Sequence, residues 1–84
     1  MTEQTYNGWK NYETWNVTLW IQNDEYLYYL ATEIVKHGGT ELPYKVFIRS
    51  MKNDNKLTTD DGVKWDDPKI DTAAVSRMLK CFAE

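Results

Sequence analysis

Apolar side chains recur at helical spacing in four segments of this chain, and short polar stretches separate the segments. The first helix is expected over about residues 12–22, because Asn11 can accept a hydrogen bond from the first helical turn. Apolar positions occupy most of the circumference of this helix. We therefore expect it to be central, with Trp15, Leu19 and Trp20 in the core.

A second helix is expected over residues 24–37. Asn23 can cap it, and Gly38-Gly39 ends it because glycine adopts a left-handed conformation at low cost. The pattern also allows one long helix that bends near residue 23. The inward stripe follows the i, i+3, i+4, i+7 rule and consists of Leu27, Leu30, Ala31 and Ile34.

A third helix is expected over residues 41–52, with Thr40 as its cap and Pro43 in its first turn. A fourth is expected over residues 72–82, capped by Asp71. The inward stripes are Tyr44, Phe47, Ile48 and Met51 in the third helix, and Val75, Met78, Leu79 and Phe82 in the fourth.

Residues 53–71 contain six Asp and show no clear periodicity. Asp61-Gly62 marks a turn in this segment, and Pro68 marks a second break. Val63 and Trp65 flank a polar residue, but a single short extended piece cannot form a sheet. We expect an ordered loop that Trp65 holds against the core.

These elements predict an all-α fold. It would be one domain over residues 1–84, with three or four helices and a long acidic loop before the last helix. Residues 1–8 begin with a polar stretch and are expected to be flexible. A chain of 84 residues supports a single core, and an aromatic share of 14% helps to fill that core.

The charge pattern disfavours two classes of partner. The net charge is −3, and ten basic residues are spread along the chain without a Lys/Arg block, so nucleic acid is not an expected partner. The apolar runs are too short to span a membrane, and no basic segment followed by an apolar one opens the chain. We therefore expect a cytoplasmic protein with no membrane partner.

The sequence contains no motif for a cofactor, a metal site or catalysis. One Cys and one His cannot supply the four ligands of a structural zinc site. Placing Gly62 at the glycine of an EF-hand loop puts Leu57 and Pro68 at ligand positions, so that motif fails. Loose binding of a divalent ion by the acidic loop stays open. His37 and Cys81 would need an orienting group to act together, and we expect neither a cofactor nor enzyme activity.

Aromatic residues are unusually dense near the N-terminus. Residues 6–25 hold three of the four Trp and two of the six Tyr, interleaved with Asn, Glu and Asp. Five aromatic residues cannot all point inward beside Leu27 and Leu30, so we expect two or three of them at the surface. They are Trp9, Tyr12, Tyr26, Tyr28 and Tyr29. Exposed Trp and Tyr are typical anchors of protein interfaces. Stacking on single-stranded bases is the rival use, but it normally requires nearby Arg and Lys.

Two segments carry a distinctive pattern. The first is Tyr12-Glu13-Thr14-Trp15-Asn16-Val17, followed by Leu19-Trp20 and Asn23-Asp24-Glu25, and the second is DGVKWDDP at residues 61–68. The first resembles the N-Y-E-T-W-N-V-x-L-W-x-x-N-D-E opening of a family of small uncharacterised proteins encoded by phages, plasmids and some bacteria, and the second resembles their C-terminal part. The resemblance implies a mobile-element origin and an all-helical fold, but no activity. On this basis we expect Glu13 and Asn16 to bond to the loop at Asp61-Gly62, so that both segments form one structural unit.

These observations favour a small non-enzymatic protein that binds and modulates a host or phage protein, for example as an inhibitor. The expected contact residues are Trp9, Tyr12, Tyr26 and Tyr29, with Asp24 and Glu25 as a charged rim. Two alternatives stay open. One is a homo-oligomeric structural module, and the other is a single-stranded nucleic-acid binder or an inhibitor that competes with nucleic acid.

Overall fold

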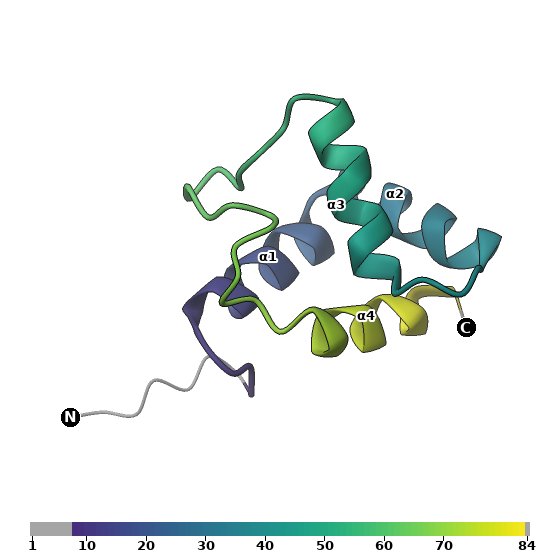
Figure 1. The fold of residues 1–84 in the computed structure, drawn as a ribbon, viewed down its shortest axis with the longest axis horizontal. Coiled ribbons are helices and arrows are strands. Elements are labelled where there is room, and N and C mark those ends of the chain that lie inside the picture. Colours follow the sequence, from purple (N-terminus) through teal and green to yellow (C-terminus); the bar gives the residue numbers. More distant parts are fainter. Residues whose placement is uncertain (1–7, 84) are drawn as a thin grey trace.

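A computed structural model describes residues 8–83 of the chain, and four α-helices surround its core (Figure 1). The helices are α1 (Tyr12–Asn23), α2 (Glu25–His37), α3 (Pro43–Asn53) and α4 (Thr72–Lys80), and the short 3₁₀ helix η1 (Cys81–Ala83) continues α4. No strand forms among the described residues, so the prediction of a small all-α fold is confirmed. The segment expected to be flexible, residues 1–8, lies outside the described residues except for Gly8.

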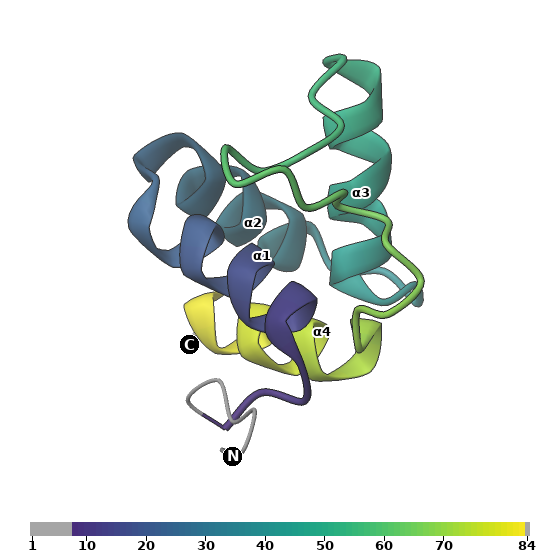
Figure 2. The same cartoon turned by 90° about the vertical axis from the view of Figure 1, so that its left-hand side faces the viewer.

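Helix α2 connects the other elements. It packs against α1, α3, α4 and η1, whereas the backbones of α1 and α3 do not approach each other in the described chain. The long connection that leaves α3 passes over α1 before it reaches α4 (Figure 1 and Figure 2). It therefore links α3 to α1, whose backbones do not approach each other among the described residues. This loop is therefore a structural layer of the fold. None of the described helices is long and apolar enough to cross a membrane.

Three residues of the α3–α4 loop belong to the apolar core: Val63, Trp65 and Ile70. Trp65 is 3% exposed and packs edge-to-face with Phe47, with ring centroids 5.3 Å apart. The Tyr44 hydroxyl donates to the carbonyl oxygen of Trp65 over 2.5 Å. The prediction of an ordered loop held against the core by Trp65 is confirmed.

A tight turn shapes the middle of this loop. The Thr59 N–H donates to the Val63 carbonyl oxygen over 2.8 Å, and Thr58 and Lys64 form an isolated antiparallel bridge. Gly62 has a φ of +88°, which glycine adopts more readily than other residues. The loop thus contains one extended pair and no sheet, as its short apolar alternation predicted.

Helix α1 buries a more polar face than its aromatic residues predicted. Its buried residues are Thr14, Asn16, Val17, Thr18 and Ile21. The expected core residues Trp15, Leu19 and Trp20 are only half-buried, so none of them belongs to the buried core, although Trp20 packs against it. The reason is that remote groups satisfy the polar side chains of α1. For example, the Thr14 hydroxyl accepts a hydrogen bond of 3.0 Å from the backbone N–H of Asp71. A buried polar group with a partner costs little free energy.

Two predicted helix caps are confirmed. The Asn11 side chain accepts from the Thr14 N–H over 2.9 Å at the start of α1. The Asp71 side chain accepts from the Ala74 N–H over 3.1 Å at the start of α4. Helix α4 ends at Lys80, two residues before the predicted end, and continues as the η1 turn.

The predicted cap of α2 is off by one residue. Asp24, not Asn23, accepts from the Leu27 N–H over 3.0 Å, because Asp24 has the extended backbone conformation that an N-cap requires. Asn23 is the last residue of α1, and its side-chain amide donates to the Leu19 carbonyl oxygen over 2.8 Å. The extended Asp24 also shows that α1 and α2 are separate helices.

Helix α3 begins later than expected, and Thr40 does not cap it. Pro43 is its first residue, and Leu42 before it is extended, because the proline ring disfavours a helical conformation at the preceding position. No side chain of its own segment caps this end. Instead, the Tyr44 N–H donates to the Ser76 hydroxyl of α4 over 3.1 Å. A tertiary contact thus replaces the local cap.

Candidate protein-binding site

Helix α2 turns three tyrosines toward solvent. Leu27 and Ala31 of its predicted stripe are buried, and Leu30 and Ile34 pack against the core. Successive residues of an α-helix are about 100° apart, so aromatic residues beside the stripe must point elsewhere. These are Tyr26, Tyr28 and Tyr29, which are 48%, 43% and 62% exposed. The expectation that several aromatic residues lie at the surface is confirmed.

The three tyrosines differ in how they are held. The Tyr26 hydroxyl donates to Asp54 Oδ2 over 3.2 Å, and the Lys56 ammonium lies 5.5 Å from the centre of its ring. The hydrogen bond to Asp54 is the main reason why the pKa of Tyr26 is raised above its ordinary value. Tyr28 stacks on Phe82 of η1, with centroids 4.4 Å apart. Tyr29 makes no side-chain hydrogen bond or ring contact among the described residues and is the most exposed of the three.

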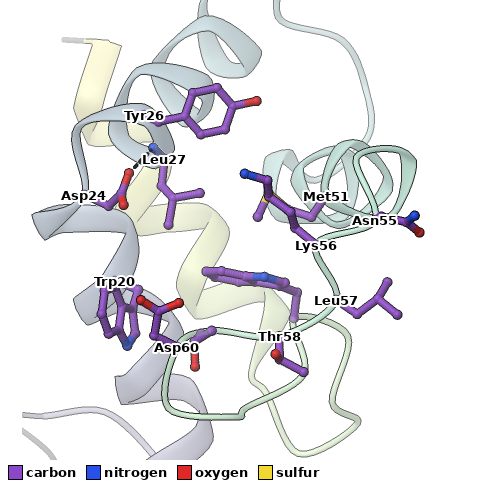
Figure 3. Close-up of a pocket in the computed structure, with 12 residues that line it drawn as sticks. Trp20, Asp24, Tyr26, Leu27, Met51, Asn55, Lys56, Leu57, Thr58 and Asp60 are labelled. Atoms are coloured by element: carbon purple, nitrogen blue, oxygen red, sulfur yellow. Dashed lines mark hydrogen bonds between the residues drawn. The ribbon is translucent and has the colours of Figure 1, made fainter.

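Two open hollows flank the first turn of α2. The junction hollow has a volume of about 450 Å³ and lies between the α1–α2 junction and residues 55–60 of the loop. Tyr26 and Leu27 line it from α2, and Trp20 and Asp60 lie opposite them (Figure 3). The second hollow, of about 350 Å³, lies beside Tyr29 on the other side of this turn. Asp24 lines both hollows.

Acidic groups surround these tyrosines. Asp24 is occupied as the cap of α2, and Asp54 accepts from Tyr26. Glu25 and Asp60 are exposed and make no hydrogen bond or ion pair within residues 8–83. The surface around the start of α2 therefore offers two uncommitted carboxylates beside two accessible aromatic rings.

The structure brings together four of the six predicted contact residues. Glu25, Tyr26 and Tyr29 lie in the first two turns of α2, and Asp24 caps the start of that helix. Trp9 lies elsewhere, in a hollow with Asp71 and Arg77. Tyr12 is half-buried against the core, and its hydroxyl accepts from the Asn16 side-chain amide over 3.4 Å. Trp9 and Tyr12 are therefore not part of the α2 surface.

The two segments with a distinctive sequence pattern, in α1 and in the α3–α4 loop, are connected by hydrogen bonds. Asn16 donates to Asp61 Oδ2 over 2.8 Å and accepts from the Thr59 hydroxyl over 2.7 Å. The Trp20 indole N–H donates to the same Asp61 oxygen over 3.0 Å. These bonds from Asn16 and Trp20 lower the pKa of the Asp61 carboxyl. The predicted bond between Asn16 and the loop is confirmed, and the network ties α1 to the loop.

Glu13 reaches a different part of this loop from the one predicted. Its carboxylate pairs with the Lys69 ammonium at 3.7 Å, near the start of α4, and not with residues 61–62. Asn11 reinforces the same place, because its side-chain amide donates to the Lys69 carbonyl oxygen over 2.8 Å. The middle of the loop and its end before α4 are therefore bonded to the first helix and its cap.

The described residues contain no group of three or more His, Cys, Asp or Glu that could hold a metal ion. His37 is exposed and lies 4.0 Å from Glu33, and Cys81 is exposed with its sulfur 3.7 Å from the Arg77 carbonyl oxygen. In the part of the chain that the structure describes, these two side chains do not hydrogen-bond to each other.

Comparison with known protein families matches residues 2–83 to a family described as "Family of unknown function (DUF7249)". The chain belongs to the DUF7249 family. The expected membership of an uncharacterised family is thus confirmed. No curated protein and no solved structure matches the chain. Family membership therefore assigns no activity to this DUF7249 protein, and its surface has to be interpreted from its own geometry.

Sequence reasoning missed residues that approach α2 from elsewhere in the chain. Asp54, Lys56 and Asp60 lie about thirty residues beyond Tyr26 in sequence but surround it or the adjoining hollow. The available signal was the concentration of Asp in the loop, which showed charge without showing where it would lie.

Proposed function

We propose that this chain is a small non-enzymatic protein that binds a host or phage protein and modulates it. On this proposal the chain is encoded by a phage or another mobile element and acts in the host cytoplasm. Binding occurs through the α2 surface, which we define as Tyr26, Tyr29, Glu25 and Asp60. The single observation that carries the proposal is the exposure of two tyrosine rings beside two uncommitted carboxylates and two hollows.

Tyrosine is well suited to this role. It provides a large contact area and loses little conformational entropy on binding, so buried tyrosines are often the residues that dominate an interface. Tyr26 is partly ordered before binding, because Asp54 holds its hydroxyl and Lys56 lies over its ring. Such preorganisation lowers the entropic cost of association.

The charges of the α2 surface define the chemistry of its partner. Glu25 and Asp60 are both acidic, and the whole chain has a net charge of −3. Complementary charge favours encounter and selects the partner. We therefore propose a partner that presents a basic patch around a concave apolar surface.

The experiment that tests this function compares three variants with the unchanged protein. A partner is captured from nuclease-treated host lysate and purified, and its affinity is measured for Tyr26→Ser/Tyr29→Ser, for Glu25→Lys, and for Glu41→Lys. Glu41 is an exposed carboxylate before α3, outside the α2 surface, and serves as the charge-reversal control, although this variant also loses the ion pair of Glu41 with Arg49. Circular dichroism confirms that each variant is folded.

The expected result is a loss of affinity of at least about thirtyfold for the double tyrosine variant, because dominant interface residues contribute about 2 kcal/mol or more. Glu25→Lys should weaken binding mainly at low salt. If all three variants bound the partner as tightly as the unchanged protein, the α2 surface would not be the interface. Light scattering on the free protein separates the homo-oligomer, since a dimer that Tyr26→Ser/Tyr29→Ser dissociates would mean that the surface binds a second copy.

A further inference from the structure

A buried polar group in this protein lacks a partner. The indole N–H of Trp65 is shielded from solvent and has no hydrogen-bond acceptor among residues 8–83. Buried donors without acceptors are rare in folded proteins, and each one requires a physical explanation. The Trp20 indole, by contrast, is satisfied by Asp61. The Trp65 N–H is thus a donor that an acceptor oxygen would complete.

Trp65 lines a small hollow with a strongly basic rim. This lysine hollow has a volume of about 170 Å³, and its lining consists of Lys52, Lys56, Lys64, Leu57, Trp65 and Asp66. Three of the ten basic residues of an acidic chain therefore line one small hollow together with Trp65. This is the opposite of the charge around the α2 surface.

The lysine hollow already stabilises one negative group of the protein itself. The Lys52 ammonium lies 2.9 Å from Asp66 Oδ2. The hydrogen bond from Lys52 is the main reason why the pKa of Asp66 is lowered, and the charge of Lys64 adds to it. One carboxylate does not neutralise three ammonium groups. The Lys64 side chain makes no hydrogen bond or ion pair in the described chain, so its ammonium group stays available.

We propose that the lysine hollow binds an oxyanion, a carboxylate or a phosphate group, and that the Trp65 N–H donates to one of its oxygens. Lys64 and Lys56 supply the charge, and the indole supplies a directed donor. Hydrogen bonds to ionised oxygens are shorter and stronger than those to neutral ones. Leu57 and Lys56 are exposed side chains on the rim, and they can rotate to admit the anion without disturbing the core. The proposed anion site is distinct from the α2 surface, although Lys56, Leu57 and Trp65 line both the lysine hollow and the junction hollow.

A contact inside the protein could also satisfy the Trp65 N–H without a ligand. Trp65 and Phe47 pack edge-to-face with an interplanar angle of 67°. If the indole N–H pointed at the Phe47 ring, the ring would act as a weak acceptor. The two arrangements predict opposite magnetic environments for this proton, because an aromatic face shields it and an anionic oxygen deshields it.

The experiment is an NMR titration of the indole N–H signals in the ¹⁵N-labelled protein. Inorganic phosphate is added in one series and acetate in another, with ionic strength held constant by sodium chloride. Trp65→Phe assigns the Trp65 signal by its disappearance. The Trp20 signal is the internal control, because its N–H is already bonded to Asp61.

The expected result is a saturable downfield shift of the Trp65 signal, with the Trp20 signal unchanged. Saturation by phosphate alone identifies a phosphate site, and saturation by acetate as well identifies a general oxyanion site. An upfield Trp65 signal that neither anion moves would overturn the proposal in favour of the Phe47 ring. Equal drift of all indole signals, as in a chloride-only series, would overturn it as well.

Two lysine variants separate the hollow from general electrostatics. Lys64→Gln should weaken phosphate binding by roughly fivefold to tenfold, since it removes one charge at the site. Lys45→Gln removes an exposed lysine of α3 that does not line the hollow, and it should leave the affinity nearly unchanged. Equal effects of the two variants would contradict a defined site.

Discussion

Helices α1 and α2 both carry several aromatic residues, but the surroundings of these residues differ. On α1, Trp20 packs against the core and donates to Asp61, forty-one positions away in sequence. On α2, Tyr29 is 62% exposed and makes no side-chain hydrogen bond or ring contact among the described residues. The same class of side chain thus closes the fold on one helix and lies free for contact on the next.

The difference shows what decides whether an aromatic residue is structural. The α3–α4 loop passes over α1 (Figure 2) and brings acceptors to its polar edges, whereas the tyrosines of α2 are exposed to solvent. Density of aromatic residues in the sequence therefore did not mark the exposed tyrosines of α2. The supply of partners from a remote segment separates the two uses.

The largest expected effect comes from removing the residue that holds the loop. Trp65→Ala should lower the free energy of unfolding by about 3–5 kcal/mol, because it leaves a large cavity beside Phe47. Urea unfolding followed by circular dichroism measures the loss. A change below about 1 kcal/mol would mean that the loop is not part of the cooperative fold.

A smaller effect is expected at the centre of the α1 network. Asn16→Ala should lower the free energy of unfolding by about 1–3 kcal/mol, because Asn16 is fully buried and its loss leaves the Thr59 hydroxyl without its acceptor. Asn23→Ala is the matched control. Asn23 is exposed and bonds only within its own helix, so this variant should be nearly neutral. If both variants lost the same free energy of unfolding, the hydrogen bonds of Asn16 to the loop would not stabilise the fold.

The network also predicts how stability depends on pH. The pKa of Asp61 is lower in the folded state than in the unfolded chain, so Asp61 stabilises the fold at neutral pH. This contribution is present above the unfolded pKa and is lost as pH falls through the lowered folded pKa, below about pH 4.

Asp61→Asn should therefore flatten the acid side of the stability curve, which urea midpoints between pH 2 and pH 6 would show. Asp60→Asn is the neighbouring control, since Asp60 has no hydrogen-bond partner in the described structure. The same change in both variants would assign the effect to the net charge of the loop.

The smallest effect on stability is expected at the α2 surface. Tyr29→Ser should change the free energy of unfolding by no more than about 0.5 kcal/mol, as is usual for exposed positions. Thermal unfolding of Tyr29→Ser and Trp65→Ala under the same conditions compares an exposed residue of α2 directly with a buried residue of the loop. A loss comparable to that of Asn16→Ala would show that Tyr29 is part of the fold.

Helix periodicity predicted much of this fold, because the stripes of α2, α3 and α4 depend on local spacing alone. Leu27, Phe47 and Val75 are buried as their spacing predicts. The choice of the buried face of α1 could not be predicted in this way, since it depends on the loop that supplies partners for Thr14 and Asn16. The cap of α3 likewise comes from Ser76 in another helix.

The candidate site was predictable in part for the same reason. Tyr26 and Tyr29 flank the stripe of their own helix, so local geometry places them at the surface. Asp60 and Lys56 reach the junction hollow only through the path of the loop. The Trp65 N–H without an acceptor has no signature in the sequence at all.

Asp24 is the only residue between α1 and α2, and it caps both the end of α1 and the start of α2. Its N–H donates to the Trp20 carbonyl oxygen over 3.0 Å, and its carboxylate accepts from the Leu27 N–H over 3.0 Å. One added residue in the next turn would rotate everything after it by about 100°. Tyr29 would then leave its outward position, and Ala31 would leave the core. This stretch can therefore tolerate a change of residue at an exposed position far better than a change in the number of residues.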